Sequence, residues 1–217
     1  MKKIFGLVTL FICMFALAIP AEMNAQLSQS QEKAIAKDVK KRAKELKKAG
    51  WEPLASTATM EYALTKYRVY LEQDPENRVA ITGIAVGNNP KIGRDNATHA
   101  GVANYAARAK AQIVGKMKSV TATEGHNVSA QEIDKFGEAY EQAVSGKVQG
   151  LIKEHFCLVR IPKNGGAKEF NVFMSLDENQ ARKAREEAAR VAREQAQLDQ
   201  IGTMVEDFIG EPVEADE

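Results

Sequence analysis

The chain has 217 residues, of which 44% are hydrophobic and 27% charged, and its 30 basic and 29 acidic residues leave a net charge of +1. A length of this order suits one domain with elaborations. The neutral balance argues against nucleic acid as the main partner, because nucleic-acid binding requires a marked basic excess.

The N-terminus has the layout of a secretory signal peptide. Lys2 and Lys3 form a positive start, and Ile4 to Ile19 form an apolar stretch interrupted only by Gly6 and Thr9. The pattern predicts a signal peptide at residues 1–25, with cleavage after Ala25, whereas an uncleaved anchor is the alternative. The apolar stretch is short for a membrane span.

The two cysteines, Cys13 and Cys157, limit the chemistry of the chain. Cys13 lies within the apolar stretch, so it does not fit the lipobox position that a lipid anchor requires. After cleavage Cys157 would be the only thiol, which excludes an intramolecular disulfide and a metal site built on paired cysteines.

Two helices are expected in an N-terminal helical segment, residues 26–76. The first is capped by Ser28 or Ser30 and extends to about Ala49. Eight basic and three acidic residues lie between Glu32 and Lys48. We interpret this surface as a solvated basic face; attraction to an anionic membrane is the alternative, but the bulky apolar residues typical of membrane-bound helices are missing. The second helix spans Thr57 to Gln73. The expected apolar stripes are Ile35, Val39, Ala43 (or Arg42) and Leu46, and then Met60, Leu64, Tyr67 and Leu71.

The stretch from Val79 to about Val120 organises the rest of the chain. Val79 to Val86 predicts a strand packed on both faces, Gly87 to Gly93 a loop, and Asp95 or Asn96 the cap of a long helix. Two apolar stripes along that helix predict that it is covered on two sides: Ala100, Ala103, Ala107, Ala111 and Val114, and then Val102, Ala106, Ala109, Ile113 and Met117. A phosphate-binding loop is the less favoured interpretation, since the glycine spacing fits neither common nucleotide motif.

After a polar break at Thr121 to Asn127, Ser129 and Glu132 form a capping-box signature that predicts another helix. Two strands, His155 to Ile161 and Glu169 to Ser175, flank an Asn-Gly-Gly turn typical of a hairpin. Asp177 opens a last helix. An acidic tail follows at residues 201–217, which we interpret as solvated and mobile, with a role in holding an oligomer as the alternative.

The order of elements indicates an α+β fold. We expect a small, mainly antiparallel three-stranded sheet packed on long helices in a core domain at residues 77–200, with the N-terminal helices as an extension.

The strand sequence Ile-Thr-Gly-Ile-Ala-Val-Gly at 81–87, the Ala-Ala-Arg-Ala segment at 106–109, and the late hairpin before a terminal helix resemble the bacterial LPP-twenty-type lipoprotein family. The resemblance covers Val79 to Gln195 and rests on a pattern, not on a catalytic signature. More loosely, the chain is similar to small α/β envelope modules of flagellar and secretion assemblies. The resemblance implies an envelope or outer-membrane-associated protein without an established enzymatic role, although the lipobox cysteine is absent.

Few residues suggest a catalytic or metal-binding site. His155 and Cys157 lie two apart on an expected strand and would share a face, as a nucleophile pair could. His99 and His126 have no partner at metal-ligand spacing. Glu61, Glu72, Asp74 and Glu76 cluster where acids are commonly solvated, and the sequons at Asn96 and Asn127 fit cap and turn positions. We therefore expect no catalytic, cofactor-binding or metal residues.

The leading functional hypothesis is an exported cell-envelope protein without catalytic activity that acts through protein–protein contacts, with envelope proteins or a second copy as partners. Peripheral membrane association is an open alternative. Two rival hypotheses are a periplasmic module that binds a small ligand in a cleft between the first two helices and the sheet, and a hydrolase that uses His155 and Cys157.

Overall fold

The computed structural model describes residues 27–54, 58–124, 128–162, 165–196, 208–209 and 211–213. The described residues form an α+β fold in which the helices and strands follow the order α1 (Gln29–Lys48), β1 (Glu52–Pro53), α2 (Met60–Glu72), β2 (Arg78–Gly87), α3 (Pro90–Glu124), α4 (Ala130–Val148), β3 (Lys153–Arg160), β4 (Lys168–Asp177) and α5 (Glu178–Ala196). The predicted signal peptide lies outside the described residues.

The sheet has four strands in the order β1-β3-β4-β2, all antiparallel. The expectation of three strands was wrong, because Glu52 and Pro53 pair with Val159 and Leu158 and add a short edge strand. Two residues are too few to produce an alternating pattern, and proline in the pair points away from a strand interpretation.

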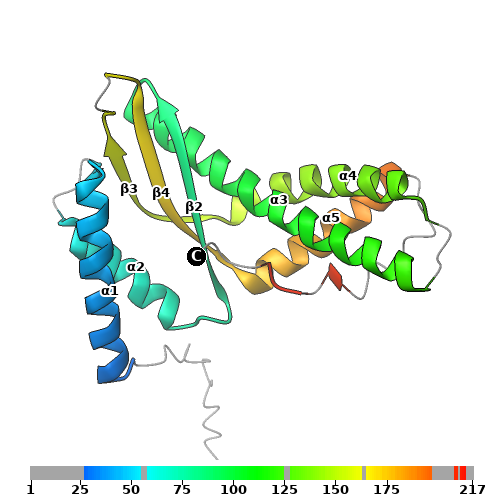
Figure 1. Cartoon of the computed structure of the whole chain (residues 1–217), viewed down its shortest axis with the longest axis horizontal. Coiled ribbons are helices and arrows are strands. Elements are labelled where there is room, and N and C mark those ends of the chain that lie inside the picture. Colours follow the sequence, from blue (N-terminus) through cyan, green and yellow to red (C-terminus); the bar gives the residue numbers. More distant parts are fainter. Residues whose placement is uncertain are drawn as a thin grey trace, which may run out of the picture.

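Helices cover both faces of the sheet (Figure 1). The α3, α4 and α5 helices pack around one hydrophobic core, which includes Ile81, Val172 and Met174 from the sheet. The α1 and α2 helices form a second core with Leu158 and Phe173, whose side chains point to the opposite face. The N-terminal helices therefore pack on the sheet through this second hydrophobic core.

The first two helices each follow a serine or threonine whose side chain caps the helix. Ser28 and Gln31 form a capping box at the start of α1, and Gly50 follows its end with φ of 84°. Thr59 caps α2 through the backbone N–H of Tyr62. The buried faces are those expected: Ile35, Val39, Ala43 and Leu46 in α1, and Met60, Leu64, Tyr67 and Leu71 in α2.

The α3 helix begins earlier and ends later than expected. It starts at Pro90, and the side chain of Asn89 accepts a hydrogen bond from the N–H of Ile92 at 3.0 Å. The prediction of a cap at Asp95 or Asn96 was therefore wrong. Proline suits the first turn of a helix, because its fixed φ is helical and an N–H there has no intrahelical partner. At its other end α3 continues to Glu124 across part of the expected polar break.

Only one of the two predicted stripes on α3 is buried. Val102, Ala106, Ala109, Ile113 and Met117 lie in the core. Ala103, Ala107 and Ala111 are exposed, so the prediction of a helix covered on two sides was wrong. Alanine is a strong helix former, and an alanine stripe therefore fits a solvated helix face as well as a buried one.

The close approach between backbones lies instead at Gly83. A Cβ atom there would lie 1.9 Å from the carbonyl oxygen of Ala97 and 2.6 Å from the backbone nitrogen of Gly101. These glycines let α3 rest directly on β2 and fix the position of the edge strand.

The C-terminal segment packs on the helical core. Ile209 and Val213 are buried, and the backbone oxygen of Glu211 accepts a hydrogen bond from Arg185 at 3.0 Å. Arg185 is 1% exposed and also contacts Glu178 at 2.5 Å and the hydroxyl of Tyr105 at 2.6 Å. The interpretation of residues 201–217 as a solvated tail was therefore wrong for Ile209 and Val213, whereas Phe208 is half-buried and Glu211 and Pro212 are exposed; the other tail residues lie outside the described part.

Candidate functional site

A cleft of about 410 Å³ lies between α1, α2 and the sheet. It is lined by Asp38, Val39, Arg42, Leu64, Tyr67, Arg68, Leu71, Ala80, Thr82 and Phe173. The apolar side chains come from both helices and from β2 and β4. This is the place where the sequence-based ligand-binding hypothesis put a cleft, and its volume is in the range of small-molecule pockets.

Aromatic rings and one hydrogen bond hold the floor of the cleft. Phe173 stacks on Phe156 with ring centroids 4.3 Å apart, and Tyr67 meets Phe173 edge-on at 5.7 Å. The hydroxyl of Tyr67 donates to the backbone oxygen of Met174 at 2.7 Å. Because this bond ties α2 to β4, the cleft is preformed and does not require a ligand to assemble it.

The cleft has a charged rim. The Arg68 Nε atom lies 3.8 Å from a carboxylate oxygen of Asp38, and Arg68 Nη2 donates to Glu72 at 2.9 Å. Arg68 Nε is buried and has no hydrogen-bond acceptor among the described residues. Arg42 lies on the same rim, 3.8 Å from Glu45. Two guanidinium groups at the edge of an apolar cleft can orient a ligand with an anionic end.

The apolar surface of the cleft continues along β2. Side chains alternate between the faces of a strand, so Ile84 and Val86 lie on the same face as Ala80 and Thr82. Ile84 and Val86 are each 55% exposed. The β2 strand is an edge of the sheet, and no described strand pairs with its outer side. An edge strand with exposed apolar side chains is suited to contact another polypeptide.

A buried amide lies on this face as well. Asn171 pairs across the sheet with Ile84 and Leu158, and it is 6% exposed. Its Oδ1 atom is buried without a hydrogen-bond donor in the described part of the chain. Leaving a buried acceptor unpaired costs about 1–3 kcal/mol. The oxygen itself is not exposed at the surface of the cleft.

His155 lies next to the cleft but is held by its neighbours. The β3–β4 register shifts between Glu154 and Phe156, and this bulge directs His155 toward α2. Its Nε2 lies 2.8 Å from the hydroxyl of Ser175, and its ring lies between those of Tyr67 and Tyr70 at 5.0 and 4.6 Å. Burial, followed by the positive charges of Lys153 and Arg78, lowers the pKa of His155 to about 4. His155 is therefore neutral at pH 7.

Cys157 lies on the other face of the sheet, within the core formed with α3, and is 8% exposed. The expectation that His155 and Cys157 share a face was wrong, because the bulge breaks the two-residue alternation between them. Burial raises the pKa of Cys157 to about 11. The thiol is therefore protonated at neutral pH, and His155 lies on the opposite face of the sheet and cannot act as its base, so this pair does not form a nucleophile site.

The remaining candidate residues are placed as ordinary surface groups. His99 is exposed on α3, and His126 and Asn127 lie outside the described residues. Glu61 pairs with Lys47 at 2.6 Å, and the Asn96 amide donates to the Val86 oxygen at 3.1 Å. No group of three or more His, Cys, Asp or Glu side chains that could hold a metal ion occurs in the described ranges.

Gly87 and Gly93, which bound the predicted loop, lie at the end of β2 and in the first turn of α3. A Cβ atom on Gly87 would lie 2.4 Å from the Cα of Gly93, and one on Gly93 would lie 2.0 Å from the ring of Phe170. The two glycines thus serve close packing at the end of the sheet. The prediction of a loop from Gly87 to Gly93 was wrong for residues 90–93, because α3 begins at Pro90 and only Asn88 and Asn89 separate it from β2.

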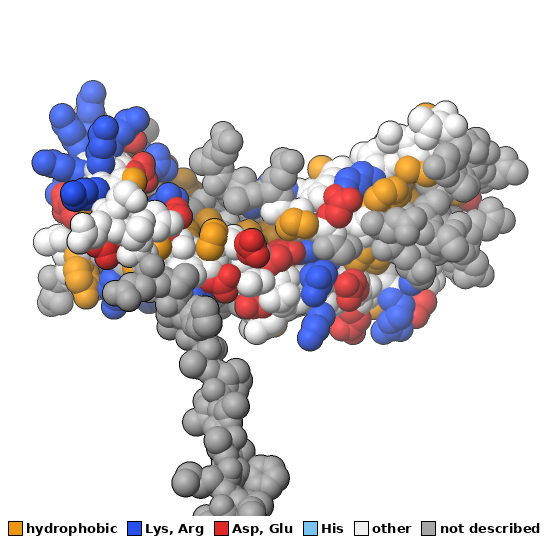
Figure 2. Space-filling view, turned by 90° about the horizontal axis from the view of Figure 1, so that it is seen from below, with side chains coloured by type: hydrophobic (Ala, Val, Ile, Leu, Met, Phe, Trp, Pro, Cys, Tyr) orange, Lys and Arg blue, Asp and Glu red, His pale blue; other side chains and the backbone are white. Residues whose placement is uncertain are grey.

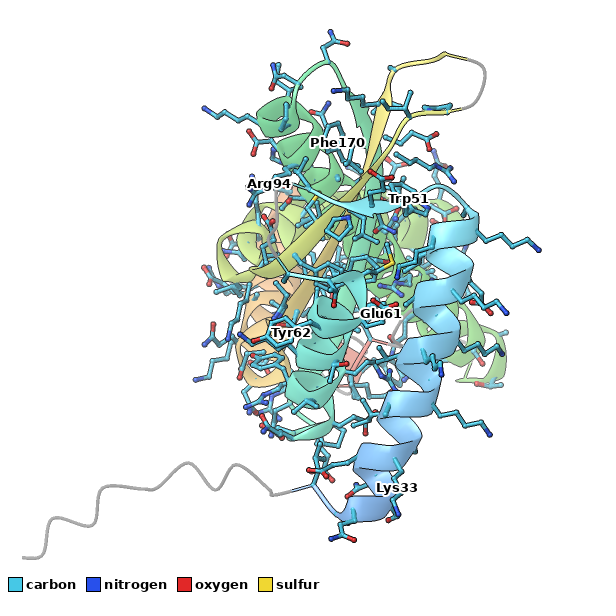
Figure 3. All side chains as sticks on the ribbon, turned by 90° about the vertical axis from the view of Figure 1, so that its left-hand side faces the viewer. Lys33, Trp51, Glu61, Tyr62, Arg94 and Phe170 are labelled. Carbon is cyan, nitrogen blue, oxygen red and sulfur yellow. The ribbon has the colours of Figure 1, made fainter. Side chains whose placement is uncertain are left out.

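A larger hollow of about 510 Å³ is lined by residues that include Lys47, Trp51 and Glu61; Figure 3 labels the last two. Its lining also includes Pro53 and Ala58, and residues 55–57 between them in the sequence lie outside the described part of the chain. The cleft between α1–α2 and β2 is therefore the better defined candidate site.

The described residues therefore form an α+β protein with a largely apolar cleft between α1, α2 and the sheet. Comparison with known protein families, with curated proteins and with solved structures finds no match. The similarity to the LPP-twenty-type lipoproteins therefore stays a prediction from the sequence pattern. Among the described helices, none is long and apolar enough to cross a membrane.

Proposed function

We propose that this chain is an exported, non-catalytic protein of the cell envelope that binds a partner protein through the cleft and the adjoining strand β2. The observation that carries the proposal is the continuous apolar surface from the cleft to the exposed Ile84 and Val86 on an edge strand. An extended partner segment can add to such an edge through backbone hydrogen bonds while its alternate side chains reach the cleft. The location rests on the signal-peptide pattern at residues 1–25.

Site-specific photo-crosslinking in intact cells tests the proposed contact. A photoreactive phenylalanine analogue replaces Ile84 in one variant and Ile92, which is 47% exposed on α3, in a control variant. We expect one discrete crosslinked partner from position 84 and none from position 92. Equal adducts from both positions, or none from position 84, would contradict the proposal.

The location has its own test. The N-terminus of the protein purified from its native host should be Gln26 or a residue close to it. A protein that retains Met1 in the cytoplasmic fraction would rule out export and leave the contact through β2 to be judged separately.

A second candidate function, the binding of a small amphiphile, is favoured by the volume of the cleft and by the guanidinium groups on its rim. Native mass spectrometry of the gently purified protein would detect a bound species, and organic extraction would release it for identification. Substitution of Ala80 by Phe fills the cleft from β2 and should abolish the bound species, whereas Ala85→Phe on the opposite face would leave the cleft itself unfilled.

A further inference from the structure

Six lysines form a band along the exposed side of α1. At 3.6 residues per turn they fall within an arc of roughly 100° around the helix axis, and the buried residues Ile35, Val39, Ala43 and Leu46 lie on the opposite side. All six side chains are exposed: Lys33, Lys37, Lys40, Lys41, Lys44 and Lys48. We call these six residues the lysine stripe.

No carboxylate lies within the lysine stripe. Of the acidic residues of α1, Asp38 and Glu45 flank the stripe and approach Arg68 and Arg42, each at 3.8 Å. Glu32 lies on the side of the helix that carries the buried residues. Lys47, beside the stripe, pairs with Glu61 at 2.6 Å. None of the six lysines forms an ion pair with a described residue, so the positive charge of the stripe is not neutralised within the described structure.

The charge is concentrated at one end of the molecule. Figure 2 shows Lys and Arg side chains gathered over the end of the molecule that holds α1, and Figure 3 shows long side chains projecting from α1 on the side away from α2. The helix has eight basic and three acidic residues, a net charge of +5, in a chain whose net charge is +1. The rest of the chain is therefore net negative, and an anionic surface would attract α1 and repel the remainder.

The residue types in the stripe indicate the kind of partner. The arc holds lysine and Ser30 but no arginine and no aromatic residue, which are the side chains that recognise individual phosphates and bases. It also has no bulky apolar residue that could insert between acyl chains. A band of six ammonium groups on one side of a helix fits a flat, diffuse negative surface, because all six can reach it at the same time.

We propose that the lysine stripe docks this protein on an anionic lipid bilayer. The α1 helix lies parallel to the surface, with the ammonium groups among the lipid headgroups and its apolar side still packed on the protein. Each lysine near an anionic membrane strengthens partitioning by about fivefold. The association is peripheral and depends on ionic strength, since it involves no burial of apolar groups in the bilayer.

Vesicle co-sedimentation tests the proposal with the full protein. Vesicles with about 30% phosphatidylglycerol in phosphatidylcholine are compared with phosphatidylcholine alone, at low salt and at about 0.5 M salt. Binding to phosphatidylcholine is subtracted, because an apolar stretch such as residues 4–19 would bind both lipids alike. We expect binding that requires the anionic lipid and is lost at high salt.

Two matched variants assign the binding to the stripe. Lys37→Gln with Lys44→Gln should weaken the anionic-lipid partition coefficient by about 25-fold. Lys135→Gln with Lys183→Gln removes the same charge from exposed positions on α4 and α5 and should change it less than twofold. Urea unfolding curves of both variants, which should match the unmodified protein, show that the fold is retained.

Three results would overturn the proposal. The first is no dependence of binding on the anionic lipid. The second is an equal loss in both double variants, which would indicate a net-charge effect without a docking face. The third is tight binding of a soluble polyanion, such as double-stranded DNA, by a protein that does not bind the vesicles.

Discussion

Replacing Gly83 with alanine should separate α3 from the edge strand β2. The added Cβ atom would lie 1.9 Å from the Ala97 oxygen, whereas real Cβ atoms essentially never approach within 3.0 Å, so the two backbones must move apart by roughly 1 Å. Overpacking a rigid contact typically costs 1–3 kcal/mol. Because the nearest atoms are all backbone atoms of α3 and no flexible side chain can move aside, we expect about 3 kcal/mol or more.

Urea and thermal unfolding followed by circular dichroism measure this loss. For a chain of this size, about 3 kcal/mol corresponds to a fall of roughly 6–12 °C in Tm. Gly115→Ala is the matched control, because Gly115 lies in the same helix and a Cβ atom there meets nothing within 4 Å. That substitution should stabilise the protein by about 0.5–1 kcal/mol, since glycine is unfavourable inside a helix.

Gly101→Ala should fall between these two variants. Its added Cβ atom would lie 2.5 Å from the terminal methyl of Met174, a side chain that can move, and 3.1 Å from the Thr82 oxygen. If Gly83→Ala and Gly115→Ala had the same midpoint, the close approach of α3 and β2 would be refuted.

Four further outcomes follow from the structure. Ala107→Leu should change the unfolding free energy by less than about 0.5 kcal/mol, because Ala107 is exposed; a larger loss would place it in a contact. Because the pKa of His155 is lowered in the folded protein, the unfolded state binds a proton more readily. The contribution of His155 to the unfolding free energy is therefore complete above pH 6.5 and falls as the pH drops toward 4. After allowance for the partial exposure of this side chain, we expect a loss of about 1–2 kcal/mol, which should be absent when His155→Gln is titrated in the same way. Peptide-level mass spectrometry should show that iodoacetamide labels Cys157 at pH 7.5 at least about 100-fold more slowly in the folded than in the unfolded protein, and rapid labelling would contradict its burial. Arg185→Met should cost about 3 kcal/mol, since it leaves the carboxylate of Glu178 buried without its cation and frees the Glu211 oxygen; an unchanged Tm would show that this ion pair is not needed.

Much of the fold could be predicted from local sequence signals. The capping boxes at Ser28 and Ser129 are present in the structure, and the stripes after them face the cores. Strand β2 was also predicted closely, because its apolar stretch is bounded by turn residues on both sides. These features depend on neighbouring residues along the chain, which a sequence displays directly.

The errors have a common physical origin in contacts between distant segments. The solvent exposure of Ala107 depends on where α4 and the sheet lie, because alanine itself favours neither side. The register shift that separates His155 from Cys157 is set by pairing with β4 and leaves no mark in the local pattern. The burial of Arg185 likewise depends on Tyr105 and on the C-terminal segment, so its sequence surroundings suggest only an exposed charged helix.

The cleft was anticipated in position but not in composition. Two amphipathic helices before a sheet indicate that a groove can form between them. The exposure of Ile84 could not be foreseen, because it results from α1 and α2 leaving the β2 side of this face uncovered.

The pairing of β2 with β4 has a consequence for how the chain reaches its native state. Val79 lies opposite Leu176, and the whole of α3, α4 and β3 intervenes in the sequence. A ladder between segments so far apart cannot close until the second has been synthesised, and closing such a long loop slows folding. During synthesis, β2 therefore stays an unpaired apolar segment, and a factor that shields it until residue 177 emerges would protect the chain from aggregation.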